Sequence, residues 1–179
     1  MFVPTKAANK VDNAVKTNNL IIVVGHSGSG KSAIIQHIAL KYREQGWIVK
    51  PMYSVEEIHD AFKAWHYMKD KTIFVFNDPI GKESFDELLY NSWERYRETV
   101  NLLIEPIKLF LSCRKSVILD QRAEEFFKEK RKIIDIDQSD IKLNKEEKIL
   151  MLKDICLGTN RHKRKLSKYW KLIRFHCYV

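Results

Sequence analysis

Runs of apolar residues alternate with amphipathic stretches along most of the chain. The run Leu20–Val24 is continuously apolar and rich in β-branched residues, which is typical of a strand buried on both faces of a parallel sheet. Further short apolar runs predict strands near residues 47–49, 72–76, 107–112 and 133–136. This alternation predicts an α/β fold, a three-layer sandwich in which helices cover both faces of a five-stranded parallel sheet.

Helical periodicity fills the intervals between the predicted strands. Thr5 is placed to cap a short first helix, because its side chain can accept from a free backbone N–H group. Residues 31–45 carry apolar side chains at helical spacing, and Gly46 follows as a stop signal. A charged helix is expected around residues 124–130.

Three tetrapeptides have the spacing of a capping box, in which a polar residue is followed three positions later by Glu. They begin at Ser54, Ser84 and Asn144. The second box predicts a long helix that continues to about Leu103, and the third predicts a last helix that stops at Gly158.

The composition describes a folded chain without a membrane span. Of its 179 residues 45% are hydrophobic, which is ample for a core, and no apolar run approaches the ~18 residues that a span requires. Its three cysteines are an odd number without CxxC spacing, so a disulfide scaffold is disfavoured and a reducing, cytoplasmic location is expected. The histidines show no ligand spacing, so they predict no metal site.

The net charge of +9 is distributed very unevenly. Residues 155–179 contain seven basic side chains and no acidic one, which leaves residues 1–154 with a net charge of only +2. Bulk basicity therefore characterises the end of the chain rather than its body, and a nucleic-acid-binding body is disfavoured.

A glycine-rich segment directly follows the first strand. It matches the P-loop pattern G-x-x-x-x-G-K-[ST], and it consists of Gly25, His26, Ser27, Gly28, Ser29, Gly30, Lys31 and Ser32. Backbone N–H groups of such a loop and the positive end of the following helix favour a phosphate, and side chains at the glycines would obstruct its approach. Lys31 is expected to reach the β- and γ-phosphates, and Ser32 to ligate Mg²⁺. A chance glycine-rich turn is disfavoured by the strand before it and the helix after it.

An acidic residue ends the third predicted strand. P-loop enzymes use an acid there to hold the Mg²⁺ shell, and a second one to activate water. This chain has Asn77 followed by Asp78, so Asp78 takes one of the two roles and hydrolysis is expected to be weak. Asn77 is expected to accept a hydrogen bond from a metal-bound water. The alternative for Asp78 is a simple Asp-Pro turn.

Arg114 follows the fourth predicted strand. An arginine at that strand end can contact the γ-phosphate and report whether the triphosphate is intact. A solvated loop arginine is an equal alternative.

Together, these motifs resemble those of the novel STAND NTPase 3 family, signal-transduction ATPases with numerous domains. The resemblance covers roughly residues 2–157 and rests on four segments in order: 25–42, 74–84, 111–114 and 142–148. It implies a sheet ordered 5-1-4-3-2, with nucleotide at the carboxyl ends of the strands. It assigns phosphate and Mg²⁺ to Lys31 and Ser32, the acidic strand end to Asp78, and the sensor to Arg114.

The resemblance also implies an organisation and a role. Residues 1–19 are a helical lead-in, 20–140 the P-loop nucleotide-binding domain, and 141–179 the start of a truncated helical lid with a basic tail. The expected function is Mg²⁺-dependent binding of ATP or GTP by a signalling switch that self-associates in its triphosphate state.

Two alternatives remain. A P-loop kinase would need a phosphate acceptor site and several converging arginines, whereas the stretch between the fourth and fifth strands offers few arginines, Arg114 and Arg122 among them, and many lysines. Binding of nucleic acid or anionic lipid through residues 161–174 is suggested by a helical apolar face surrounded by lysines. We favour the interpretation that this face is a covering segment with solvated lysines.

Overall fold

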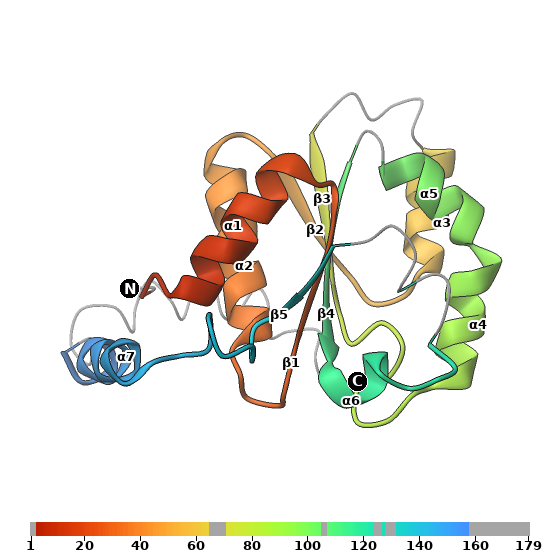
Figure 1. Ribbon diagram of the computed structural model, residues 1–179. Helices are drawn as coiled ribbons and strands as arrows, with labels where there is room; N and C mark the ends of the chain where they lie inside the picture. The colour runs from red at the N-terminus through yellow and green to blue at the C-terminus, as the bar shows by residue number, and fades with distance from the viewer. Residues whose placement is uncertain (1–2, 65–70, 105–106, 124–126, 128–131, 158–179) are drawn as a thin grey trace. The chain divides into compact units, whose positions relative to one another are not determined.

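The computed structural model describes residues 3–64, 71–104, 107–123, 127 and 132–157 (Figure 1). Contacts divide the chain into two compact units. One comprises Lys6–Lys142, and the other combines the start of the chain with the segment from Leu143 onward. Among the described residues no helix is long and apolar enough to cross a membrane.

The first unit is built on a five-stranded sheet whose pairings are all parallel. Its strands lie in the order β2-β3-β4-β1-β5, which is the expected order 5-1-4-3-2 seen from the opposite edge. The strand bounds are, in chain order, β1 Leu20–Gly25, β2 Ile48–Met52, β3 Thr72–Asn77, β4 Lys108–Arg114 and β5 Lys132–Asp135. The predicted α/β sheet is therefore confirmed.

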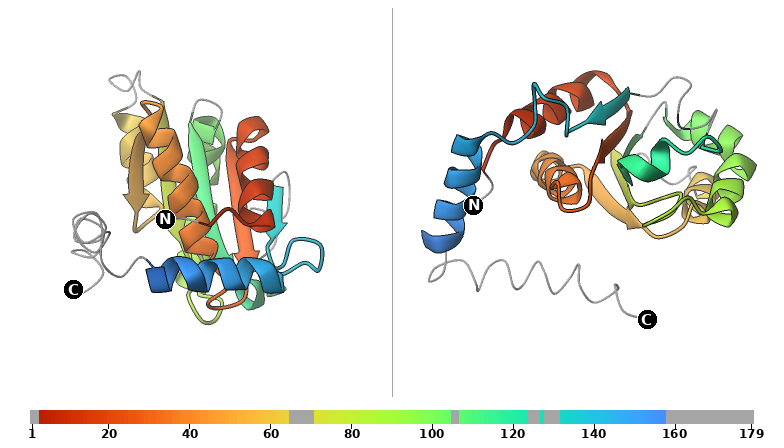
Figure 2. Two further views of the ribbon diagram at one scale, coloured as in Figure 1. Left: turned by 90° about the vertical axis from the view of Figure 1, so that its left-hand side faces the viewer. Right: turned by 60° about the horizontal axis from the view of Figure 1, so that its bottom comes forward.

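Helices cover both faces of this sheet, as the sandwich prediction requires. Helices α1 (Lys6–Thr17) and α2 (Lys31–Glu44) cover one face and lie in front of the strands in the left view of Figure 2. Helices α3 (Glu56–Lys63), α4 (Glu87–Arg95) and α5 (Arg97–Ile104) cover the other (Figure 1). Strand β1 is buried along its whole length, which explains its continuously apolar sequence.

The loop after β3 is fixed by the core beneath α4. Trp93 is 1% exposed, packs between Phe76 and Phe127, and donates from Nε1 to the carbonyl oxygen of Pro79 at 3.0 Å. Gly81 has a φ of 118°, and a Cβ there would lie 2.1 Å from the carbonyl oxygen of Ser84. The loop therefore has little freedom, and it holds the end of β3 in one position.

Two of the capping predictions agree with the structure. Glu57 accepts hydrogen bonds from the backbone N–H groups of Tyr53 and Ser54, at 2.8 and 3.0 Å. In the second unit, Asn144 and Glu147 cap each other's backbone N–H groups at 2.8 and 2.9 Å, and helix α7 (Lys145–Leu157) follows.

The prediction of a capping box at Ser84 is wrong. Asp86 is the N-cap of α4, and its carboxylate accepts from the N–H groups of Leu88 and Leu89 at 3.0 and 3.1 Å. The predicted single helix to Leu103 is also wrong, because the chain leaves helical geometry at Tyr96 and starts again as α5.

Other differences concern the chain after β4. This strand extends two residues further than predicted and leads directly into a short helix, α6 (Lys115–Ile118). Most of the predicted charged helix at 124–130, and the whole basic segment 161–174, lie outside the described residues.

Candidate functional site

The loop between β1 and α2 has the backbone geometry that its glycines permit. Gly28 and Gly30 have φ values of 74° and 93°, a region that other residues rarely adopt. Among the described residues, and apart from its chain neighbours, no atom would lie within 4 Å of a Cβ at either position, so glycine is favoured there by the backbone conformation. Gly30 is the N-cap of α2 and has no side chain to accept from the first N–H groups of that helix. Those donors are therefore oriented toward any anion at the loop.

Gly25 is required for a different reason, because other side chains lie too close to it to leave room for a Cβ. A Cβ there would lie 2.7 Å from Ser29 Oγ and 3.0 Å from a carboxylate oxygen of Asp137. The same Asp137 oxygen accepts from the backbone N–H of His26 at 2.5 Å. His26 itself is exposed, and its Nε2 lies 3.9 Å from this carboxylate. The turn after β5 therefore holds the first residues of the loop.

Lys31 is the buried cation of the site. It is 8% exposed, and its Nζ donates to the carbonyl oxygens of Gly25 and His26, at 3.1 and 2.7 Å. Burial lowers the pKa of Lys31, and the nearby carboxylates of Asp78 and Asp137 partly oppose that effect. A poorly solvated ammonium folded against its own loop gains strongly from an incoming phosphate.

Asp78 lies just beyond the carboxyl end of β3 in a left-handed conformation, with φ of 53°. Its N–H donates to the carbonyl oxygen of Ser112 at 2.8 Å, and its own carbonyl accepts from Gly81 N–H at 3.2 Å. Burial raises the pKa of the Asp78 carboxyl, while the charges of Arg114 and Lys31 act in the opposite direction. The structure thus brings three predicted residues into one electrostatic neighbourhood, although Asp78 also forms a turn.

Arg114 is the last residue of β4 and is half-buried. In the sheet it pairs with Gly25, the first residue of the P-loop. Its location next to the loop and to Asp78 suits contact with a bound phosphate.

Sequence reasoning missed the residues that connect neighbouring strand ends. Ser112 donates from Oγ to Asn77 Oδ1 at 2.7 Å. Lys115 forms a 2.7 Å ion pair with Asp135, which raises the pKa of Lys115 and joins α6 to β5. The signal in the sequence was the presence of polar residues at or near the ends of β3, β4 and β5, and this signal does not identify the partners.

A divalent cation fits the donors present. Ser32 lies in the first turn of α2, and Asp78 supplies a carboxylate at the neighbouring strand end. Among the described residues no cluster of three or more His, Cys, Asp or Glu side chains forms a protein cage for a metal. Mg²⁺ is commonly held by one or two protein oxygens together with substrate phosphates and water, and this donor set matches that pattern.

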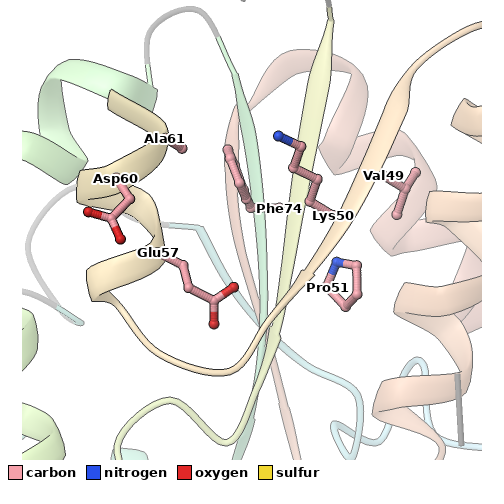
Figure 3. Close-up of a pocket in the computed structure, with 7 residues that line it drawn as sticks. All are labelled: Val49, Lys50, Pro51, Glu57, Asp60, Ala61 and Phe74. Atoms are coloured by element: carbon pink, nitrogen blue, oxygen red, sulfur yellow. The ribbon is translucent and has the colours of Figure 1, made fainter. Parts of the chain in front are cut away.

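A separate hollow of about 370 Å³ lies between β2 and α3 (Figure 3). Its charged side chains are Lys50, Glu57 and Asp60, and Phe74 forms part of its apolar wall. Strand β4 separates β3, the nearer strand, from the P-loop strand β1. This hollow therefore contributes no residue to the loop site.

Comparison with known proteins decides the family. The family model for novel STAND NTPase 3 matches residues 2–157. The chain belongs to the novel STAND NTPase 3 family. Membership supports nucleotide binding by this P-loop domain. No curated protein sequence matches the chain.

Solved structures share the fold of this STAND NTPase domain. DnaA from Aquifex aeolicus bound to AMPPCP aligns with a TM-score of 0.57 and 16% identity, over 99% of this chain and 64% of that one. A DNA replication initiation factor aligns with a TM-score of 0.53 and 14% identity, over 92% of this chain and 53% of that one. The STAND NTPase chain thus spans less than two thirds of the length of these relatives, and at such identities the likeness concerns the fold alone.

Proposed function

We propose that this STAND NTPase domain binds a nucleoside triphosphate, ATP or GTP, together with Mg²⁺ at the loop Gly25–Ser32. The observation that carries the proposal is the state of Lys31. Its ammonium is buried and poorly solvated, its hydrogen bonds to the described residues go to carbonyl oxygens of the loop, and it lies at an uncapped helix start. A phosphate supplies the negative charge that this arrangement lacks.

The other site residues take roles that suit their positions. Backbone N–H groups of Gly28–Ser32 hold phosphate oxygens, and Ser32 and Asp78 provide oxygens to Mg²⁺. When bound, Mg²⁺ would neutralise part of the negative charge of the phosphates. Arg114 contacts the terminal phosphate and distinguishes triphosphate from diphosphate.

Hydrolysis is slow in this proposal, because Asn77 contributes no charge beside Asp78. A long-lived bound state suits a cytoplasmic signalling switch, in which the triphosphate form self-associates through the nucleotide-binding domain. The lifetime of the complex, and not turnover, then determines the output.

Thermal unfolding with added nucleotide tests this function. A ligand at 100 times its Kd stabilises a folded protein by about 2.7 kcal/mol, so ATP or GTP with Mg²⁺ should raise Tm by several degrees. Lys31→Ala should abolish that rise, whereas Lys63→Ala, at an exposed position of α3, should retain it. An equal rise in parent and Lys31→Ala proteins would contradict the site assignment. Single-turnover hydrolysis of radiolabelled nucleotide, with light scattering, then measures turnover and self-association.

A further inference from the structure

Ser112 joins β4 to two successive residues at the end of β3. It is 1% exposed and pairs with Asn77 across the parallel sheet. Its Oγ donates to Asn77 Oδ1 at 2.7 Å, and its carbonyl oxygen accepts from Asp78 N–H at 2.8 Å. One buried residue therefore sets both the side-chain orientation of Asn77 and the backbone position of Asp78.

The direction of the hydroxyl bond follows from burial. A buried hydroxyl proton without an acceptor costs about 1–3 kcal/mol. Among the described residues the acceptor for Ser112 is Asn77 Oδ1. The reverse orientation of the amide would leave that proton unpaired. Asn77 therefore turns its oxygen toward Ser112, and its amide nitrogen is the group that no described residue engages.

The amide lies on the face of the sheet from which Lys31 reaches the site. Phe110 packs edge-on against Tyr42 of α2, and Ser112 is two residues further along the same strand, so both side chains face α2. Asn77 pairs with Ser112 and shares that face. Lys31 begins α2, and a P-loop lysine reaches the outer phosphates of a bound nucleotide.

We propose that Asn77, oriented by Ser112, donates a hydrogen bond from Nδ2 to an oxygen of the terminal phosphate of the bound triphosphate. The inference rests on the proposed function and adds a specificity-determining residue to that site. It also assigns a positioning role to Ser112. This role differs from the sequence-based expectation, in which Asn77 accepts a hydrogen bond from a metal-bound water.

The two roles predict different dependence on metal and on phosphate number. A donor to the terminal phosphate discriminates triphosphate from diphosphate, and it does so with or without Mg²⁺. A group that acts through a metal-bound water loses its effect when the metal is removed.

The test measures Kd for fluorescent ATP and ADP, and for GTP and GDP, on the full chain in Mg²⁺ and again in EDTA. Asn77→Ala should weaken triphosphate binding about tenfold, the effect of one hydrogen bond to a charged group. Diphosphate binding should change less than about twofold, and both results should persist in EDTA. Asn91→Ala, at an exposed position of α4, is the matched control and should behave as the parent.

Ser112 variants test the positioning role. Ser112→Ala should weaken triphosphate binding by about threefold, because the amide remains but is no longer oriented. Ser112→Thr keeps the hydroxyl and should restore binding. The double variant Asn77→Ala/Ser112→Ala should bind no worse than Asn77→Ala alone, since the two residues act as a unit. Circular dichroism and Tm confirm that each variant is folded.

Three outcomes would overturn the inference. If Asn77→Ala loses equal affinity for diphosphate and triphosphate, Asn77 does not contact the terminal phosphate. If the loss of affinity disappears in EDTA, Asn77 acts through a metal-bound water instead. If the losses of triphosphate affinity add up in the double variant, Ser112 does not act through Asn77. If the parent and Lys31→Ala bind triphosphate equally, the proposed function fails as well, and that result is distinguishable from the other three.

Discussion

At the scale of single residues, Asp78 adopts a conformation and an environment that are unfavourable for the folded protein without ligand. It is a non-glycine residue with positive φ, and its carboxylate is partly removed from water. Such local strain and desolvation persist only where the surrounding structure over-determines them, as the hydrogen bonds to Ser112 and Gly81 do here.

Asp78→Asn should therefore stabilise the nucleotide-free protein at pH 7. Because burial raises the pKa of Asp78 above its unfolded value, ionisation of this group opposes folding. The favourable contribution of the protonated form is fully present below pH 3.8 and is lost as pH rises through the folded pKa. The gain in Tm from Asp78→Asn should thus be largest near pH 7 and vanish as pH falls toward 4. Asn also tolerates the left-handed backbone.

The measurement is thermal unfolding of parent and variant between pH 4 and 8, with Asp60→Asn, at an exposed position of α3, as a control that should show no such trend. A lower Tm for Asp78→Asn at pH 7 would contradict this account.

The residues of the site fall into two groups, those that a local sequence motif identifies and those that only the folded structure identifies. The location of Lys31 and Asp78 beside strand ends could be predicted, because each belongs to a local motif that directly follows an apolar strand. Ser112 and Asp137 could not, because each acts on a loop 30 or more positions away. Only the parallel register of the sheet brings those strand ends together.

At the scale of elements, local capping signals predicted some helix starts and missed others. The sequence predicted Ser84 as the cap of α4, but Asp86 is the residue whose carboxylate accepts from the helix. The loop from Ile80 is closed by a hydrogen bond from Asp86 N–H to the Ile80 carbonyl at 2.9 Å. Ser84 lies inside that loop and cannot begin the helix. The hydrogen bond that closes this loop therefore determines where α4 begins.

Helix α4 should accordingly depend on Asp86 and not on Ser84. Asp86→Ala should lower the free energy of unfolding by about 0.5–2 kcal/mol, since two backbone N–H groups lose their acceptor. Ser84→Ala should change it by less than about 0.5 kcal/mol, as is usual for exposed positions. Urea denaturation measures both values, and the reverse ranking would show that Ser84 is the cap.

A buried lysine at the start of β4 shows the same limit of local signals. Lys108 is 8% exposed and donates to the Val15 carbonyl oxygen at 2.7 Å and to Asn19 Oδ1 at 3.2 Å. Burial lowers its pKa. The sequence alone does not distinguish Lys108 from a solvated lysine at a strand end. The oxygens that accept its hydrogen bonds lie about 90 positions earlier in the chain, at and just after the end of α1.

At the scale of the whole molecule, the alternation of apolar runs predicted the sandwich, and the resemblance to the STAND family implied the strand order. Periodicity alone could not give that order, because it contains no information on which strands are neighbours. In the observed order β2-β3-β4-β1-β5, the P-loop, Asp78 and Arg114 lie at the carboxyl ends of three neighbouring strands.

Charge is also partitioned at this scale. Lys31, Ser32, Asp78 and Arg114 all belong to the unit Lys6–Lys142, whereas residues 155–179 hold seven basic side chains. Removal of residues 159–179 should therefore leave the Kd for triphosphate within about twofold of the parent value. Fluorescence titration at two salt concentrations checks this expectation. A large loss confined to low salt would assign the basic segment a part in phosphate binding.

The central claim is that a triphosphate binds at the P-loop through Lys31. The most direct measurement is the equilibrium Kd of a fluorescent ATP or GTP for the full chain with Mg²⁺, compared between parent, Lys31→Ala and Lys63→Ala. We predict saturable binding by parent and Lys63→Ala, and a loss of at least about tenfold for Lys31→Ala. Equal affinity of all three proteins would contradict the assignment of this loop as the nucleotide site.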